Sequence, residues 1–98
     1  MTPFRELDPL LHSQLRLAVM SVLISVDSAD FTYLRDKTGA TAGNLSVQIG
    51  KLKEAGYISV SKSFGESYPQ TMCRITEVGR KKFAEYVAAL NDYLKSEG

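Results

Sequence analysis

The 98-residue chain has one cysteine, one histidine and no tryptophan, and it contains no long run of apolar residues. A single cysteine excludes an internal disulfide framework, and one Cys with one His cannot supply a zinc site built from these ligands. No apolar stretch approaches the roughly 18 residues that a membrane-spanning helix needs, and the first residues lack the pattern of a secretory signal peptide. These absences predict a cytoplasmic protein that does not bind a membrane.

The sequence also lacks the residue patterns of common active sites. It has no glycine-rich phosphate loop, no paired carboxylates and no cluster of metal ligands. The one histidine, His12, precedes the first long helical pattern, and a lone histidine more often makes a structural hydrogen bond than acts as a base. Cys73 points inward on an expected strand, where a thiol behaves as a small hydrophobe; redox sensing is the alternative. We predict that the chain is not an enzyme and needs no cofactor or metal.

Charge is unevenly distributed, although the formal net charge is only +1. Residues 40–82 carry seven Lys or Arg and three Asp or Glu, a surplus of +4, whereas the flanking regions are acidic. A basic stretch in a nearly neutral chain favours one contact face for an anionic partner. On charge alone, the surplus lysines could equally serve only to solvate a surface.

Apolar residues at helical spacing predict a first helix over residues 13–26. They cover most of its circumference instead of a single stripe, so we expect this helix to be buried on more than one side. Ser13 is the expected N-cap, because its hydroxyl can accept a hydrogen bond from a free backbone N–H of the first turn.

Two shorter helices follow closely along the chain. The second is expected over residues 33–37 with Thr32 as its N-cap, and Gly39 suits the left-handed conformation that ends a helix. The third is expected over residues 42–55 with Thr41 as its N-cap. Two helices joined by a tight turn that contains glycine form a helix-turn-helix unit.

After the third helix the hydrophobic period changes from 3.6 to 2. This alternation predicts a β-hairpin with strands near residues 58–64 and 71–75 and turn residues at 65–69, followed by a last helix over about residues 77–95. The predicted fold is therefore mostly α with a small β-hairpin, in the order α-α-α-β-β-α of a winged helix-turn-helix. We expect residues 1–98 to form a single domain of this kind.

Five segments also follow a known family pattern: LDPLLHS (7–13), LRLA (15–18), GNLS (43–46), KLKEAGY (51–57) and RITEVGR (74–80). In these segments the chain resembles the small winged-helix transcriptional regulators related to the MarR and ArsR groups, over roughly residues 7–94. The resemblance implies a homodimeric DNA-binding regulator. It also implies that residues 42–55 form the recognition helix and residues 62–74 the wing.

Two positions depart from the family pattern. Gly50 stands where relatives usually have a basic residue, and the wing tip at residues 65–70 carries one acid and no base. Each lost phosphate contact lowers affinity and reduces the salt dependence of binding. We therefore expect weaker DNA binding than in relatives with basic wings.

The outer face of the third helix is the expected DNA-contacting surface. A rotation of 100° per residue turns small and polar side chains outward when the aliphatic ones, Leu45, Ile49 and Leu52, face the core. Asn44 or Gln48 could pair with an adenine edge, Val47 could contact a thymine methyl group, and basic side chains could hold phosphates. The predicted DNA-binding residues are Thr41, Gly43, Asn44, Ser46, Val47, Gln48, Lys51, Lys62 and Arg74. The alternative is that these residues are an ordinary helix cap and solvated side chains.

Apolar residues of the first and last helices exceed what one small domain can bury. We therefore predict a two-fold interface that spaces two recognition helices near the major-groove repeat of about 34 Å. The predicted interface residues are Leu10, Leu11, Leu90, Tyr93 and Leu94. The alternative is a monomer whose own helices cover these side chains.

The leading hypothesis is a homodimeric transcriptional regulator that binds a specific double-stranded DNA sequence. The alternative is a winged-helix module that binds another protein and no specific DNA. The tyrosines near the expected dimer interface further suggest a pocket for an unknown small-molecule effector.

Overall fold

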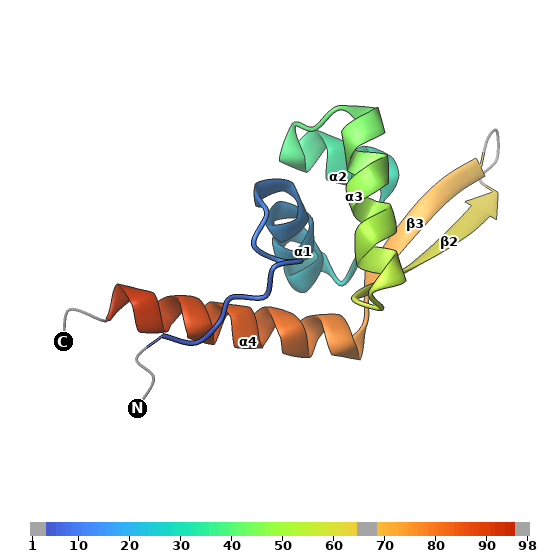
Figure 1. Cartoon of the computed structure of the whole chain (residues 1–98). Coiled ribbons are helices and arrows are strands. Elements are labelled where there is room, and N and C mark those ends of the chain that lie inside the picture. Colours follow the sequence, from blue (N-terminus) through green and yellow to red (C-terminus); the bar gives the residue numbers. More distant parts are fainter. Residues whose placement is uncertain (1–3, 65–68, 96–98) are drawn as a thin grey trace.

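The computed structural model of the chain describes residues 4–64 and 69–95. It contains four helices and one small sheet (Figure 1). In chain order the elements are α1 (Gln14–Val26), β1 (Ser28–Asp30), α2 (Phe31–Thr38), α3 (Ala42–Glu54), β2 (Ile58–Phe64), β3 (Pro69–Ile75) and α4 (Glu77–Leu94). The predicted winged helix-turn-helix order is confirmed.

The sheet has three antiparallel strands in the order β1-β3-β2, one strand more than the predicted hairpin. Cys73 at the centre of β3 lies opposite Val60 of β2 on one side and Ala29 of β1 on the other. We predicted a first helix that ends at residue 26 and no strand between it and the second helix. Strand β1 has just three residues, which is too short a stretch for its alternation to predict a strand, and it forms because its backbone pairs with β3.

The ends of the helices follow local hydrogen bonding, with two corrections to the predicted caps. Thr41 accepts a hydrogen bond from the backbone N–H of Asn44 at 3.2 Å, as expected of the α3 N-cap. The N-cap of α2 is Asp30 and not Thr32, because the Asp30 carboxylate accepts from the Tyr33 N–H at 2.7 Å. Ser13 occupies the N-cap position of α1, but its side chain makes no capping hydrogen bond.

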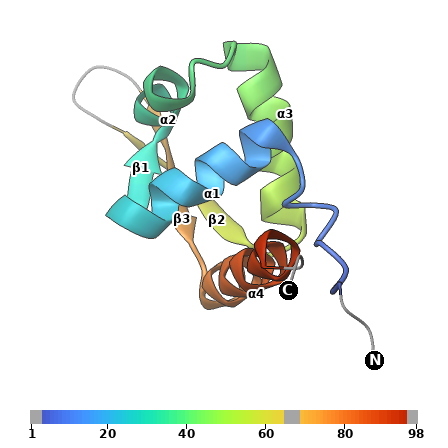
Figure 2. The same ribbon diagram turned by 90° about the vertical axis from the view of Figure 1, so that its left-hand side faces the viewer.

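Helix α1 lies in the middle of the molecule, with α2, α3, α4 and the sheet arranged around it (Figure 2). This arrangement explains why its apolar residues are not confined to one stripe. The fully buried side chains of the core come from the segment before α1 and from α1, α2, α3 and β3, and they include Leu11, Val19, Met20, Leu23, Leu34, Leu45, Leu52 and Cys73. The predicted core face of α3, Leu45, Ile49 and Leu52, is confirmed.

Helix α4 starts in close contact with the turn after α3. Thr76 is its N-cap: the hydroxyl accepts from the Gly79 N–H at 2.9 Å and donates to the Gly56 carbonyl at 2.6 Å. At Gly79, an added Cβ would lie only 2.1 Å from the Tyr57 carbonyl oxygen. Only glycine permits this approach of helix and turn, which sets the direction in which α4 leaves the domain.

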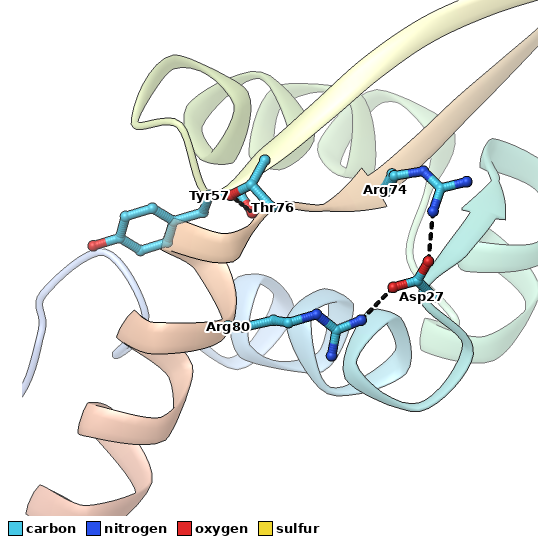
Figure 3. Close-up of polar contacts among 5 residues, drawn as sticks. All are labelled: Asp27, Tyr57, Arg74, Thr76 and Arg80. Atoms are coloured by element: carbon cyan, nitrogen blue, oxygen red, sulfur yellow. Dashed lines mark hydrogen bonds and ion pairs between the residues drawn. The ribbon is translucent and has the colours of Figure 1, made fainter.

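An ion-pair cluster joins the end of α1 to the wing and to α4 (Figure 3). Asp27 has a left-handed backbone conformation (φ 74°), and its carboxylate binds both Arg74 on β3, at 2.5 Å, and Arg80 on α4. The two arginines therefore have a partner within the chain. All three side chains are partly exposed, so the cluster orients these elements more than it stabilises them.

Candidate nucleic-acid interface

The outer face of α3 is open to solvent along its whole length. Gly43, Asn44, Ser46 and Lys51 are exposed, and Val47 is 55% exposed although it is apolar. The helix begins with small and polar residues and ends with Lys51 and Lys53, which interact favourably with its dipole. A protruding helix with this face has the size and chemistry to enter a major groove.

Gln48 is half-buried, because it lies on the side of α3 that faces the start of α1. Its carbonyl oxygen accepts a hydrogen bond from Arg16 of α1, and its amide nitrogen donates to the Asn44 carbonyl oxygen at 3.0 Å. Asn44 and Gln48, the two residues predicted to pair with adenine, therefore form one hydrogen-bonded unit. Arg16, which holds this unit, was not among the predicted site residues.

A groove of about 380 Å³ separates α3 from the wing. Its polar rim has Ser46, Gly50 and Lys53 on the helix and Lys62 and Thr71 on the two wing strands. Lys53 was not among the predicted site residues. It follows Ser46 and Gly50 at helical spacing, so the three residues form a stripe that faces the wing, and this spacing could have revealed it.

Of the two predicted basic residues of the wing, Lys62 and Arg74, only Lys62 lines the groove. Its side chain is exposed, opposite Thr71 in the strand register. The guanidinium of Arg74 instead pairs with Asp27. We therefore leave Arg74 out of the proposed phosphate contacts. Residues 65–68 of the predicted wing tip lie outside the described residues.

The residues predicted to form a dimer interface have different environments. Leu11 is fully buried in the core of its own chain, so it has no surface to offer to a second copy. Leu10 and Leu90 are half-buried, and Tyr93 and Leu94 are 40% and 72% exposed near the end of α4.

The N-terminal segment lies along this half of α4. The Phe4 ring stacks on Tyr93 at a centroid distance of 4.7 Å, and Arg5 pairs with Asp92 at 2.8 Å. Phe4 and Val87 are also exposed. Phe4 contacts Tyr93, and Val87 lies two helical turns before Leu94. The C-terminal end of α4 projects beyond the body of the domain (Figure 1).

The groups that could serve catalysis have structural partners. His12 Nδ1 lies 2.9 Å from the Tyr86 hydroxyl, in line with the predicted structural role of His12. The Tyr57 hydroxyl donates to Asp8 at 2.5 Å, and burial together with this hydrogen bond raises the pKa of Tyr57 to about 12. Burial, with a smaller contribution from Asp30, raises the pKa of Cys73 to about 11 and keeps it a protonated thiol at neutral pH.

The described residues hold neither a cluster of metal ligands nor a helix suited to a membrane. Across residues 4–64 and 69–95, no group of three or more His, Cys, Asp and Glu side chains has the arrangement of a metal site. Over the same ranges, no helix combines the length and the apolar character required to cross a bilayer.

The helix-turn-helix, the adjoining wing and the open face of α3 define a winged helix DNA-binding domain. A model of the family described as winged helix DNA-binding domain matches residues 15–94. The chain belongs to this family, whose fold is that of DNA-binding transcriptional regulators and not of enzymes. An uncharacterized protein of Methanocaldococcus jannaschii is 32% identical over 76 residues, which cover 78% of this chain and 83% of that protein.

Solved structures have the same fold. A transcriptional regulator homologue from Pyrococcus horikoshii OT3 superposes with a TM-score of 0.84 at 24% identity, covering 89% of this chain and 86% of that one. BpsR of Bordetella bronchiseptica superposes with a TM-score of 0.75 at 16% identity, covering 92% of this chain and 67% of that one. Structural neighbours include a MarR-family regulator, and the predicted likeness to such regulators is confirmed.

Proposed function

We propose that the chain is a homodimeric transcriptional regulator that binds a specific double-stranded DNA sequence, with α3 in the major groove and the wing beside it. The observation that carries the proposal is the open outer face of α3, where Asn44, Ser46 and Val47 are exposed. Such side chains can contact base edges and thymine methyl groups. Thr41 and Gly43, at the helix start, are placed to let backbone N–H groups approach a phosphate.

Basic residues on α3 and on the neighbouring wing supply the proposed phosphate contacts. Lys51 continues the outer face of α3, and Lys53 and Lys62 flank the groove between α3 and the wing. A DNA strand that follows this groove would place its phosphates between the two lysines. Because phosphate neutralisation releases counterions, each such lysine contributes to the salt dependence of binding.

The homodimer is proposed from the apolar surface at the projecting end of α4. Four of the eight large apolar side chains that are exposed among the described residues belong to the second half of α4 and the segment packed on it: Phe4, Val87, Tyr93 and Leu94. A two-fold axis near Leu94 would bring the same surface of both copies together. It would also place two α3 helices on one side of a duplex, as a pseudopalindromic site requires.

Selection from a random duplex library, together with the solution mass from analytical ultracentrifugation, tests the proposal. We expect a dimer mass and an enriched inverted repeat. Lys51→Ala and Lys62→Ala should each reduce the slope of log K against log salt by about 0.9. Lys82→Ala is the matched control on α4, where the lysine Nζ lies 4.0 Å from a Glu85 carboxylate oxygen, and it should leave the slope unchanged. A monomer would refute the dimer, and unchanged slopes would remove these lysines from the phosphate contacts.

The alternative function, a winged-helix module that binds a protein, predicts no enriched duplex at low salt. The exposed apolar end of α4 is the one observation that favours it. A complex that forms through this surface while the chain remains monomeric, without selection of DNA, would decide for this alternative.

The proposal also includes a small-molecule effector and a cytoplasmic location, where the chain would meet chromosomal DNA. The effector is supported by a neighbour of the same fold, BpsR, whose DNA binding is regulated by 6-hydroxynicotinic acid. A hollow of about 420 Å³ between the start of α1 and α3 is a candidate place for it. A thermal-shift screen of aromatic acids, followed by DNA binding with any ligand found, tests this part.

A further inference from the structure

Arg16 of α1 reaches out of its own helix to the side of α3. Its Nε donates to the Leu10 carbonyl at 2.6 Å, and its Nη1 donates to the Gln48 side-chain carbonyl. Two bonds in different directions fix the guanidinium, and the half-buried position of Arg16 limits competition from water. The side chain therefore acts on α3 from a rigid support.

The bond from Arg16 determines the orientation of two amides in series. A guanidinium only donates hydrogen bonds, so Gln48 must turn its carbonyl oxygen toward Arg16. The Gln48 amide nitrogen then faces the start of α3, where it donates to the Asn44 carbonyl oxygen at 3.0 Å. Asn44 must in turn direct its carbonyl toward Gln48, which leaves its amide nitrogen as the outer end of an exposed side chain.

We propose that Arg16 is a positioning residue for base selection. Acting through Gln48, it fixes the Asn44 amide so that DNA meets a hydrogen-bond donor at this point. We call Arg16, Gln48 and Asn44 the amide relay. This inference rests on the proposed function, because it assumes that α3 lies in the major groove.

The amide relay has a specific consequence for the base opposite Asn44. In the major groove, adenine, guanine and thymine each present an acceptor, whereas cytosine presents only its N4 amino donor. A donor fixed on Asn44 therefore disfavours cytosine at one position of each half-site. A freely rotating asparagine would accept cytosine by turning its carbonyl outward.

Selection from a random duplex library with three variants tests the proposal. Arg16→Lys keeps the charge but replaces the guanidinium, with its several N–H donors, by a single ammonium nitrogen. The ratio by which the selected sequences disfavour cytosine at this position should then fall about fivefold or more. Gln48→Glu replaces the amide with a group that only accepts, so Asn44 must turn its amide nitrogen toward Glu and its carbonyl toward DNA. Cytosine should then be preferred at that position. Arg35→Lys, the same chemical change on α2 and outside the amide relay, is the matched control and should leave this position unchanged.

NMR of the free protein reports on the amide relay without DNA. The side-chain amide signals of Asn44 and Gln48 should shift in Arg16→Lys and stay in place in Arg35→Lys, while the melting temperatures verify that the variants are folded. Unshifted amide signals would overturn the proposal. A second result would also overturn it: the base preferences of Arg16→Lys and Gln48→Glu stay unchanged, and Arg16→Met reduces the salt slope of DNA binding by about 0.9. Arg16 would then be a phosphate contact and not a positioning residue.

The two measurements separate failure of this inference from failure of the proposed function. If the wild-type chain selects no duplex while the amide signals shift as expected, the proposed function fails and the base-selecting role of Arg16 fails with it. If the wild-type chain selects a duplex and the variants leave cytosine excluded, only the role of Arg16 is overturned.

Discussion

The same substitution, glycine to alanine, should have opposite effects at two helical positions. At Gly50, on the exposed face of α3, an added Cβ meets no atom within 4 Å. The variant gains only helix propensity, about 1 kcal/mol. For a domain of this size, 1 kcal/mol corresponds to a rise of about 4–8 °C in melting temperature.

At Gly79, in the first turn of α4, the added Cβ would lie 2.1 Å from the Tyr57 carbonyl oxygen and 3.1 Å from Ile75 Cγ1. The nearest atom belongs to the backbone and cannot rotate away, so α4 must shift. Overpacking of this kind costs about 1–3 kcal/mol or more, which exceeds the gain in propensity. We expect Gly79→Ala to lower the melting temperature by several degrees.

Thermal unfolding followed by circular dichroism, at one protein concentration for all samples, measures both effects. The wild-type chain is the reference, and each variant serves as the control for the other because the chemical change is identical. If both variants moved in the same direction, the close approach of α4 to Tyr57 or the open space at Gly50 would be refuted.

Further predictions concern charge and titration. Gly50→Lys should steepen the salt slope of DNA binding by about 0.9, and an unchanged slope would place position 50 away from phosphate. Asp27→Asn keeps a residue that tolerates the left-handed conformation but removes the charge between two arginines. Because exposed ion pairs contribute about 0.2–1 kcal/mol each, the melting temperature of this variant should fall by a few degrees at low salt and by less at high salt. Cys73, with a pKa of about 11, should resist iodoacetamide at pH 8 until the chain is unfolded, and rapid labelling of the native protein would contradict its burial. The pKa of Tyr57 is about 12 in the folded chain and 10.0 as a free phenol, so its contribution to stability is complete below pH 10 and is lost as the pH rises through 12. Urea unfolding should show a smaller decline over this range for Tyr57→Phe.

Much of the fold could be predicted because its signals are local. Thr41 and Gly39 mark a helix start and a helix end through backbone groups only a few residues away, and both have the predicted roles. The stripe that ends in Leu52 was visible from helical spacing alone. The same spacing placed Val47 and Lys51 on the outer face, where the structure has them.

The features that the sequence did not predict arise where residues distant in sequence meet. Strand β1 forms only because β3 lies beside it, and Asp30 becomes the cap of α2 because that strand ends there. Arg74 was predicted to bind DNA from its strand position, but Asp27, 47 residues away, pairs with it. Leu11 was predicted to meet a second copy, but the core of its own chain covers it.

The sequence by itself determined the order of the elements, the face that α3 buries and the residues that it leaves outside, because periodicity and capping act within one or two helical turns. Only the tertiary structure decided which polar side chains stay available to a partner. Arg16 and Gln48 are 32 residues apart, and their bond exists because α1 packs beside α3. Hydrogen bonds and ion pairs of this kind depend on the distance between folded elements, which no local pattern encodes.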